Sequence, residues 1–260
     1  MDISLQRELA RLLATLRREG RQQSGLDPRL VPPDTRTAYR VAQMVADELD
    51  RQVTGWKIAA MKEEMQKALR TDQPIYGRVL APLAASPLTV SHAKLCSPIP
   101  EVEYQVRLGS DLPPRAKAYT VEEVTEAVAS LHPGLELAEC RFIHDAAFPP
   151  LPAILADGAG SGTIIYGPPI EDWRSRDIAG RTVALLCNGK MRREGSAAAA
   201  IEHPIVPVVW LANELSRTGI GLKAGEMIST GTLTGMLAPK PGDHYVADFG
   251  PFGSVVLNVT

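Results

Sequence analysis

Apolar residues recur at helical spacing in the first quarter of the chain. The five leucines of residues 3–18 fall on one side of a helix with 3.6 residues per turn, which predicts an amphipathic helix. Asp34 is a candidate N-cap for a second helix, because apolar residues follow it at the same spacing over residues 38–49. Residues 62–70 also have a helical pattern. The chain is therefore expected to begin with helices.

Strand patterning dominates the remainder. Two helices interrupt it: one begins near Thr120, with Glu123 at the capping-box position, and another begins at His203-Pro204. Asn188-Gly189 predicts a hairpin turn. The segments with strand-like patterning are residues 56–60, 74–80, 101–108, 135–142, 163–167, 182–187, 226–233, 244–249 and 253–259.

This distribution favours an α+β fold with a sandwiched or rolled sheet. Helices and strands do not alternate regularly, as they would in a doubly wound α/β sheet. We expect a mainly helical region over residues 1–70 to pack on a β-rich catalytic core over residues 71–260, and the two together to form one structural domain. No internal repeat or low-complexity linker separates the two regions.

Composition and charge exclude several classes of protein. The formal net charge of the 260 residues is -2, which gives no electrostatic basis for binding nucleic acid. No run of 18 apolar residues predicts a membrane span, and the charged N-terminal segment lacks the apolar block of a signal peptide. The three widely spaced cysteines argue against a disulfide framework. We therefore expect a cytoplasmic protein that binds neither nucleic acid nor membrane.

Two glutamates stand close together in one strand-like segment. Glu101 and Glu103 are two residues apart, so their side chains are expected on the same face of a strand. Glu136 lies between two leucines in a later strand-like segment, where burial would demand a partner for its charge. A divalent cation would relieve the repulsion among three carboxylates, and an all-oxygen ligand set suits Mg²⁺ or Mn²⁺. The alternative is a solvated face whose acids pair with Arg107 and Arg141, and the pattern alone leaves both interpretations open.

A series of motifs occurs in order from about residue 35 onwards. The motifs are GWKIAA (55–60), PIYGRVL (74–80), EVEYQVRLGSDLP (101–113), LELAECRF (135–142), ADGAGSGTIIYG (156–167), NGKMRREGSAAAAIEHPIVPVVWLANEL (188–215), LKAGEMISTGTLT (222–234) and KPGD (240–243). Together they resemble the hydratase/decarboxylase branch of the fumarylacetoacetate hydrolase superfamily. That branch includes 2-oxopent-4-enoate hydratase and 4-oxalocrotonate decarboxylase.

The resemblance implies a fold, a metal and a class of reaction. The fold would be a mixed β-sandwich roll with flanking helices, assembled as a homo-oligomer. Glu101, Glu103 and Glu136 would bind Mg²⁺ or Mn²⁺, and Lys57 would be a catalytic residue that contacts the substrate. The expected activity is that of a metal-dependent lyase acting on a small 2-oxo acid. Hydration of a 2-hydroxy-2,4-dienoate or 2-oxo-4-enoate is the first expectation.

Departures from the family pattern bear on the reaction. Ile75, a candidate substrate-binding residue, stands where the hydratases carry an aspartate implicated in hydration. An apolar residue here is typical of the decarboxylases, so decarboxylation of a 4-oxalocrotonate-like 2-oxo-enedioate is the alternative. Gly158 and Gly160 replace polar residues of a loop that contacts substrate in the family, and Ala197 and Glu202 replace two glycines.

Four further residues are candidates for the site. Asp157 is a candidate catalytic residue, and a role in capping a turn is equally open. Ser161, Thr230 and Thr234 are candidate substrate-binding residues, although turns use the same hydroxyls. Hydrolysis of a C–C bond in an acylpyruvate is a third possible reaction. It is the least favoured, because residues 1–60 contain no histidine that could activate water.

Overall fold

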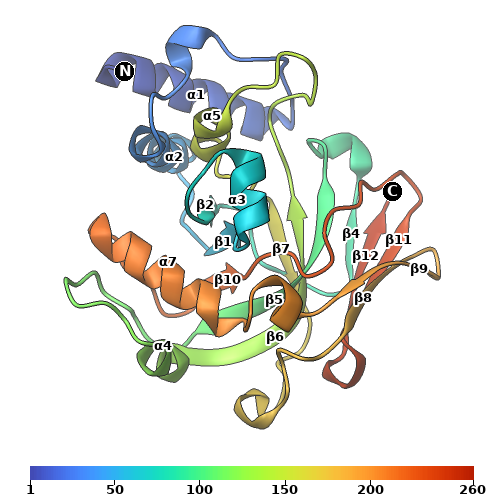
Figure 1. The fold of residues 1–260 in the computed structure, drawn as a ribbon. Coiled ribbons are helices and arrows are strands. Elements are labelled where there is room, and N and C mark those ends of the chain that lie inside the picture. The colour runs from blue at the N-terminus through green and yellow to red at the C-terminus, as the bar shows by residue number, and fades with distance from the viewer.

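Two mixed β-sheets form the body of the protein in a computed structural model that describes residues 1–260 (Figure 1). The strands are β1 (Gly55–Ala59), β2 (Ile75–Val79), β3 (Ala84–Ala85), β4 (Leu88–Val90), β5 (Ile99–Leu108), β6 (Val128–Ala138), β7 (Thr163–Tyr166), β8 (Val183–Cys187), β9 (Lys190–Gly195), β10 (Met227–Ser229), β11 (His244–Asp248) and β12 (Ser254–Val259). The larger sheet has seven strands in the order β2-β1-β10-β5-β6-β7-β3. The smaller sheet has five strands in the order β4-β12-β11-β8-β9.

Helices surround the larger sheet, and three of them gather at one end of the molecule (Figure 1). The helices are α1 (Ile3–Glu19), α2 (Thr35–Leu49), α3 (Glu63–Leu69), α4 (Val121–Ala127), α5 (Leu151–Ala156), α6 (Ala197–Ala200) and α7 (Ile205–Arg217). Helix α2 packs between α1 and α5, and the three share a buried cluster that includes Leu13, Val45 and Leu155. No helix is both long enough and apolar enough to span a lipid bilayer.

The alternation of side chains along β5 gives the larger sheet two different faces. Tyr104 of β5 is completely buried in the main hydrophobic cluster, together with Leu185 of β8 and Leu257 of β12. Successive residues of a strand point to opposite faces, so Glu103 and Gln105 point away from this cluster. The packing of two sheets with flanking helices confirms the predicted α+β sandwich.

The two helices predicted at the start of the chain are confirmed. Asp34 caps α2 by accepting a hydrogen bond from the backbone N–H of Thr37 at 2.7 Å. Ile75 and Phe142, which come later in the chain, join the buried cluster that these helices form. The N-terminal helices and the rest of the protein therefore share buried apolar surface.

The helix predicted to begin near Thr120 forms but is short. Its capping box forms, with reciprocal hydrogen bonds between Thr120 and Glu123, but α4 ends at Ala127. Val128 begins β6, which pairs with β5, and its side chain is buried in the main cluster. Packing in the sheet thus outweighs the local preference for helix.

The strand predicted over residues 135–142 ends at Ala138, and the residues after it form a buried ion-pair network. Arg141 Nε lies 2.9 Å from Asp157 Oδ2, and the backbone N–H of Arg141 donates to the same carboxylate at 3.0 Å. Arg17 of α1 approaches Asp157 Oδ1 at 3.3 Å. Since Asp157 is completely buried, the network ties α1 to the loop that follows α5.

Replacing Asp157 with alanine should destabilise the fold strongly, because Arg17 and Arg141 would keep buried charges without a partner. Removing one member of a buried ion pair typically costs about 3–5 kcal/mol. Urea unfolding followed by circular dichroism measures the change. The matched control is Glu63→Ala, which removes an exposed ion pair with Lys67 and should change stability little. Equally small effects of both substitutions would contradict the structural role of the network.

Candidate metal and substrate site

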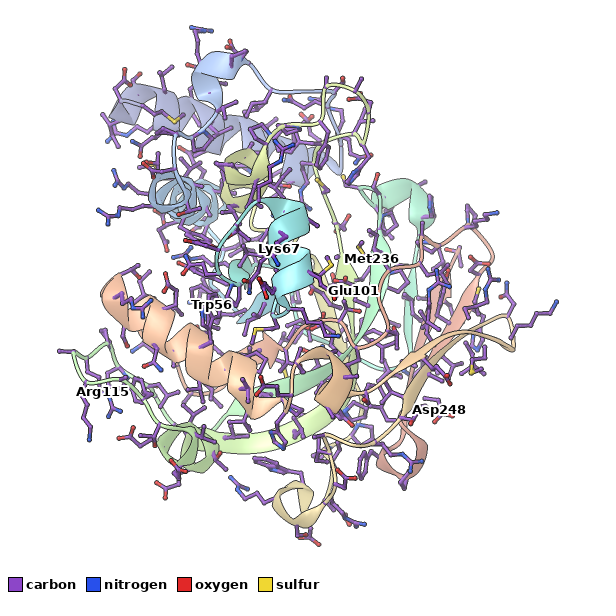
Figure 2. The ribbon with its side chains drawn as sticks, viewed as in Figure 1. Trp56, Lys67, Glu101, Arg115, Met236 and Asp248 are labelled. Atoms are coloured by element: carbon purple, nitrogen blue, oxygen red, sulfur yellow. The ribbon has the colours of Figure 1, made fainter.

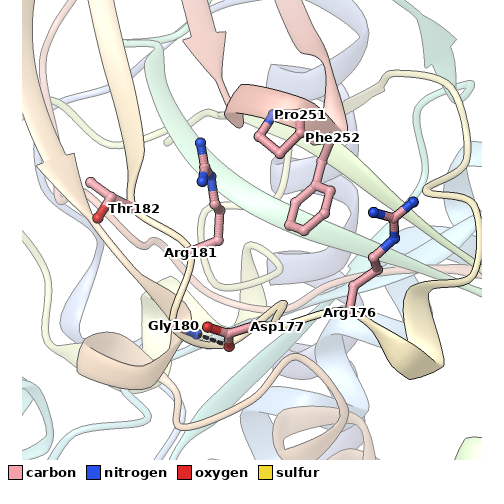
Figure 3. Close-up of a pocket in the computed structure, with 7 residues that line it drawn as sticks. All are labelled: Arg176, Asp177, Gly180, Arg181, Thr182, Pro251 and Phe252. Carbon is pink, nitrogen blue, oxygen red and sulfur yellow. Dashed lines mark hydrogen bonds between the residues drawn. The ribbon is translucent and has the colours of Figure 1, made fainter.

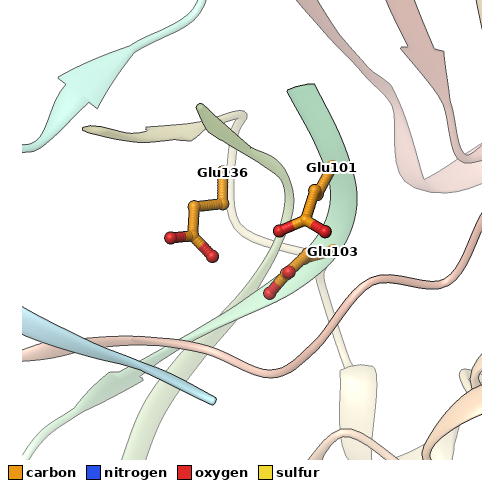
Figure 4. Close-up of side chains that lie close together, drawn as sticks. All are labelled: Glu101, Glu103 and Glu136. Carbon is orange, nitrogen blue, oxygen red and sulfur yellow. The ribbon is translucent and has the colours of Figure 1, made fainter. Parts of the chain in front are cut away.

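The pairing of β5 with β6 brings the three glutamates together (Figure 4). Glu101 lies opposite Glu136 in the ladder, and Glu103 follows Glu101 on the same face. One carboxylate oxygen from each residue lies within 4.8 Å of the other two. The exposed fractions of Glu101, Glu103 and Glu136 are 8%, 1% and 0%. These acids form a buried cluster, so the alternative of a solvated strand face is wrong. In Figure 2, Glu101 lies near the middle of the molecule.

Burial makes this cluster unfavourable without a cation. Burial raises the pKa of Glu136 to about 7. Burial and the nearby charges of Glu136 and Glu101 raise the pKa of Glu103 well above its ordinary value. Neither carboxylate oxygen of Glu136 has a hydrogen-bond partner. Buried acceptors without partners point to a ligand that the chain does not itself supply.

Lys57 supplies a positive charge beside the cluster. Its Nζ atom lies 3.7 Å from Glu136 Oε2, and its side chain is 5% exposed. Burial by itself would lower the pKa of Lys57, but the attraction of the three glutamates outweighs burial, so the pKa is raised. Three carboxylates and one ammonium group sum to a formal charge of -2, since -3 plus +1 is -2. A divalent cation would neutralise that remainder.

The donor atoms of the cluster suit a hard divalent cation. The cluster contains three carboxylates and neither histidine nor cysteine. Such oxygen ligands are typical of Mg²⁺, Mn²⁺ and Ca²⁺ sites rather than zinc or copper sites. Three protein ligands would also leave coordination positions for water and for a chelating substrate. The residues present therefore fit a divalent cation.

Comparison with known proteins identifies the family. Residues 61–260 match the family model described as fumarylacetoacetate hydrolase, C-terminal. The protein belongs to the fumarylacetoacetate hydrolase family. The chain is 33% identical over 212 residues to the 2-keto-4-pentenoate hydratase of Paraburkholderia xenovorans (strain LB400), a match that covers 80% of this chain and 76% of the relative. It is 30% identical over 196 residues to the 2-hydroxyhexa-2,4-dienoate hydratase of Comamonas testosteroni, with 74% and 73% covered.

A solved structure shares the whole fold. The 4-oxalocrotonate decarboxylase from Pseudomonas putida G7, complexed with magnesium and adipate, superposes with a TM-score of 0.88. The superposition covers 100% of this chain and 99% of that one, at 22% sequence identity. This likeness confirms the fold that the resemblance implied. Both the family and its hydratase/decarboxylase branch, as inferred from the motifs, are thereby confirmed.

The family motif PIYGRVL places Ile75 beside Lys57. Ile75 pairs with Ala59 across β1 and β2, and Ala59 is two residues from Lys57 on the same strand. The two side chains are therefore expected on the same face of the sheet. Ile75 is 6% exposed and packs in the cluster of the N-terminal helices. Ile75 thus adds an apolar side chain to the face of the sheet that carries Lys57, and the contact of Ile75 with substrate stays a prediction.

The hydroxyl groups predicted to bind substrate are not equivalent. Thr230 Oγ1 donates to the backbone oxygen of Tyr104 at 3.0 Å, so the structure uses this hydroxyl to hold β10 against β5. Ser161 Oγ and Thr234 Oγ1 are buried and have no hydrogen-bond partner. Of the three, Ser161 and Thr234 are free to bind a ligand, and their roles stay predictions.

The structure does not bring Asp157 into the glutamate cluster. Its carboxylate is held by Arg17 and Arg141, in the network described above. Arg141 also donates to the backbone oxygen of Ser161 at 3.3 Å. This geometry suits the positioning of the loop that carries Ser161. The catalytic role that the sequence suggested for Asp157 stays a prediction.

Two residues that the sequence interpretation missed lie directly beside the cluster. Ser229 Oγ donates to Glu103 Oε2 at 2.6 Å, and Gln105 Nε2 donates to Ser229 Oγ at 2.9 Å. Gln105 is two residues after Glu103, so the spacing that paired Glu101 with Glu103 also placed Gln105 on their face. No comparable signal in the sequence pointed to Ser229.

Two pockets on the surface differ in their relation to the cluster. A pocket of about 430 Å³ is lined by Arg176, Arg181 and neighbouring residues (Figure 3) and contains none of the predicted site residues. A second pocket, of about 460 Å³, lies between residues 61–64 and residues 198–202. A Cβ atom built on Gly231 would lie 3.4 Å from Ile201 Cγ2 and 4.0 Å from Met61 Cγ, two side chains that line this second pocket.

Binding of a divalent cation should weaken as the pH falls below about 7. A proton occupies Glu136 below its raised pKa, and the cation must displace that proton. Each displaced proton lowers the apparent affinity by about tenfold for each pH unit below the pKa of the acid that holds it. Calorimetric titration of the metal-free protein with Mn²⁺ between pH 5.5 and 8.5 measures this slope. An affinity that does not change over that range would contradict the prediction.

Proposed function

We propose that this protein is a divalent-metal-dependent hydratase that adds water to a small 2-oxo-4-enoate, supplied as its 2-hydroxy-2,4-dienoate tautomer. The buried cluster of three glutamates beside Lys57 carries the proposal. The curated relatives at 30–33% identity, both hydratases, support this reaction. The solved neighbour of the same fold was complexed with magnesium, which supports a divalent cation as the partner of this protein.

The residues of the site divide the work of hydration. Glu101, Glu103 and Glu136 would hold the cation, which when bound supplies Lewis acidity toward the 2-oxo group. The reaction moves the proton of the 2-hydroxyl group to C5 and then adds the hydroxyl of water at C4 and its proton at C3. Both steps need a group that holds and moves a proton. Lys57 is a titratable group beside the cluster that is not itself a proposed ligand. We therefore assign to its Nζ atom the donation of that proton or the anchoring of the substrate carboxylate.

The purified protein should consume 2-hydroxypenta-2,4-dienoate in the presence of Mg²⁺ and form 4-hydroxy-2-oxopentanoate. Loss of the dienoate absorbance in the ultraviolet measures the reaction, and EDTA should abolish it. Glu103→Gln should lower turnover by about 100-fold or more, because a neutral amide is a poor ligand for a hard cation. Circular dichroism checks that the variant is folded. Wild-type turnover in the variant would contradict the assignment of Glu103 as a metal ligand.

Decarboxylation is the second candidate, and Ile75 favours it. Ile75 cannot exchange a proton. Loss of CO₂ moves the electrons of the breaking C–C bond into the conjugated 2-oxo group, and the enolate that results takes up one proton from water. The same assay with 2-oxohex-3-enedioate and a CO₂ trap separates the two reactions. If the protein releases CO₂ from this diacid and does not consume the dienoate, its function is decarboxylation and not hydration.

The charge around the second pocket indicates whether the tail of the substrate, the end far from its 2-oxo acid group, is charged. Met61 and Ile201 of this pocket lie next to Gly231, whose backbone N–H donates to Glu103 Oε2 at 2.7 Å. Two apolar lining residues of the pocket therefore lie beside a glycine that contacts the cluster. Its charged residues are Lys62, Glu63, Glu64 and Glu202. Glu63 is paired with Lys67, so Glu64 and Glu202 remain against Lys62. This excess of negative charge disfavours a second carboxylate and supports a substrate with an uncharged, apolar tail.

The preference for an uncharged tail should depend on the charged residues of the second pocket. The kcat/KM for 2-hydroxyhexa-2,4-dienoate should exceed the value for the corresponding dienedioate by about tenfold, the size typical of pocket discrimination. Glu202→Lys should reduce the ratio of the two kcat/KM values several-fold. Added salt should also reduce this ratio in the wild-type protein, because it screens the charges. Glu171→Lys, an exposed charge reversal at a residue that does not line the pocket, is the control. An equal change in the kcat/KM ratio for both substitutions would show that the pocket does not receive the tail of the substrate.

A further inference from the structure

The three glutamates of the cluster are not held equally. Glu103 Oε2 accepts two hydrogen bonds, from Ser229 Oγ at 2.6 Å and from the backbone N–H of Gly231 at 2.7 Å. Glu136, by contrast, has no hydrogen-bond partner at either oxygen. Two donors on one oxygen fix the plane of the Glu103 carboxylate. Its other oxygen is left free.

Ser229 itself accepts a hydrogen bond from a second buried side chain. Gln105 Nε2 donates to Ser229 Oγ at 2.9 Å, and β5 and β10 place these two residues directly opposite each other. Gln105 and Ser229 are completely buried, and Glu103 is 1% exposed. The chain of contacts from Gln105 to Glu103 is therefore shielded from water along its whole length.

The charge of Glu103 sets the direction of these hydrogen bonds. A carboxylate that binds a metal is ionised and can only accept. Ser229 must therefore donate its single hydroxyl proton to Glu103, and its oxygen is then free to accept from Gln105. This requirement orients the Gln105 amide with its nitrogen toward Ser229. Each group has one arrangement that satisfies its neighbour.

Gln105 occupies a position that packing alone would not assign to a polar residue. Its Oε1 atom is buried without a partner, which costs free energy that an apolar side chain of similar size would avoid. The space for the side chain exists because residue 134 is glycine: a Cβ atom there would lie 2.2 Å from Gln105 Cγ. An amide retained under these conditions points to a role at the site that it faces.

We propose that Gln105 and Ser229 are positioning residues for the metal. They hold Glu103 Oε2, and this fixes the carboxylate in a position where one of its oxygens lies within 4.8 Å of oxygens of Glu101 and Glu136. Glu103 is thus the fixed ligand around which a divalent cation is bound. The inference rests on the proposed metal-dependent function, and it adds two residues that hold the carboxylate of Glu103 in place by hydrogen bonds. Outer partners of this kind typically change metal affinity by about 10- to 100-fold when removed.

The affinity of the metal-free protein for Mn²⁺ and Mg²⁺, measured by isothermal titration calorimetry, tests the proposal. Ser229→Ala should weaken binding about 10- to 100-fold, and Gln105→Met should weaken it less, because Gln105 acts through Ser229. Ser229→Thr keeps a hydroxyl at this position and should restore most of the affinity. The Mg²⁺ concentration that gives half-maximal activity should rise in parallel with each dissociation constant.

Tyr104→Phe is the matched control. Tyr104 lies between Glu103 and Gln105 on β5 but faces the opposite side, where its hydroxyl donates to the backbone oxygen of Ile178 at 3.2 Å. Its loss removes a buried hydrogen bond from the same strand, so it should lower the melting temperature and leave the metal affinity unchanged.

Two outcomes would overturn the proposal. Affinities within about twofold of wild type in both Ser229→Ala and Gln105→Met would show that the chain of hydrogen bonds does not support the ligand. If Ser229→Ala does not fold, the affinity of Gln105→Met decides in the same way. A wild-type protein that binds neither cation would overturn the metal site and, with it, the proposed function. Normal wild-type binding with unaffected variants would overturn only the positioning role.

Discussion

The burial of three carboxylates on one face of paired strands is the constraint on which the rest of the structure depends. Glu101 and Glu136 lie opposite each other, and Glu103 follows on the same face. Three like charges in a water-poor environment require positive charge nearby. Lys57 supplies part of it. A slip of one residue in the register would exchange the acids with Val102 and Tyr104 and would drive charge into the core between the sheets.

The elements around the cluster follow from this constraint. Strand β1 brings Lys57 to the acids, and β10 brings Ser229 to the oxygen of Glu103. The N-terminal helices contribute from farther away: Arg17 of α1 shares Asp157 with Arg141, and Arg141 in turn holds the loop of Ser161. Hydration and decarboxylation can both use such a site, because both place negative charge on the 2-oxo group. The difference between them lies in the proton-transfer groups and in the surroundings of the substrate tail.

Much of the fold could be predicted from local patterns. The apolar spacing of residues 3–18, the Asp34 cap and the capping box at Thr120 each describe a helix that forms. Alternation along residues 101–108 correctly separated the acids from the core side chains. These features depend on residues only a few positions apart, where helical and strand periodicities act. The end of α4 at Ala127 could not be predicted in this way, because pairing with β5 decides it.

The sequence by itself determined which side chains share a face and which family the chain belongs to, since strand periodicity and the order of motifs are local and linear properties. Only the tertiary structure decided which distant residues meet. Gln105 and Ser229 are 124 residues apart, and Arg17 and Asp157 are 140 residues apart. Contacts over such separations depend on the order and register of strands in a sheet and on the docking of helices against it. No spacing along the chain encodes them, because they arise when the whole core packs.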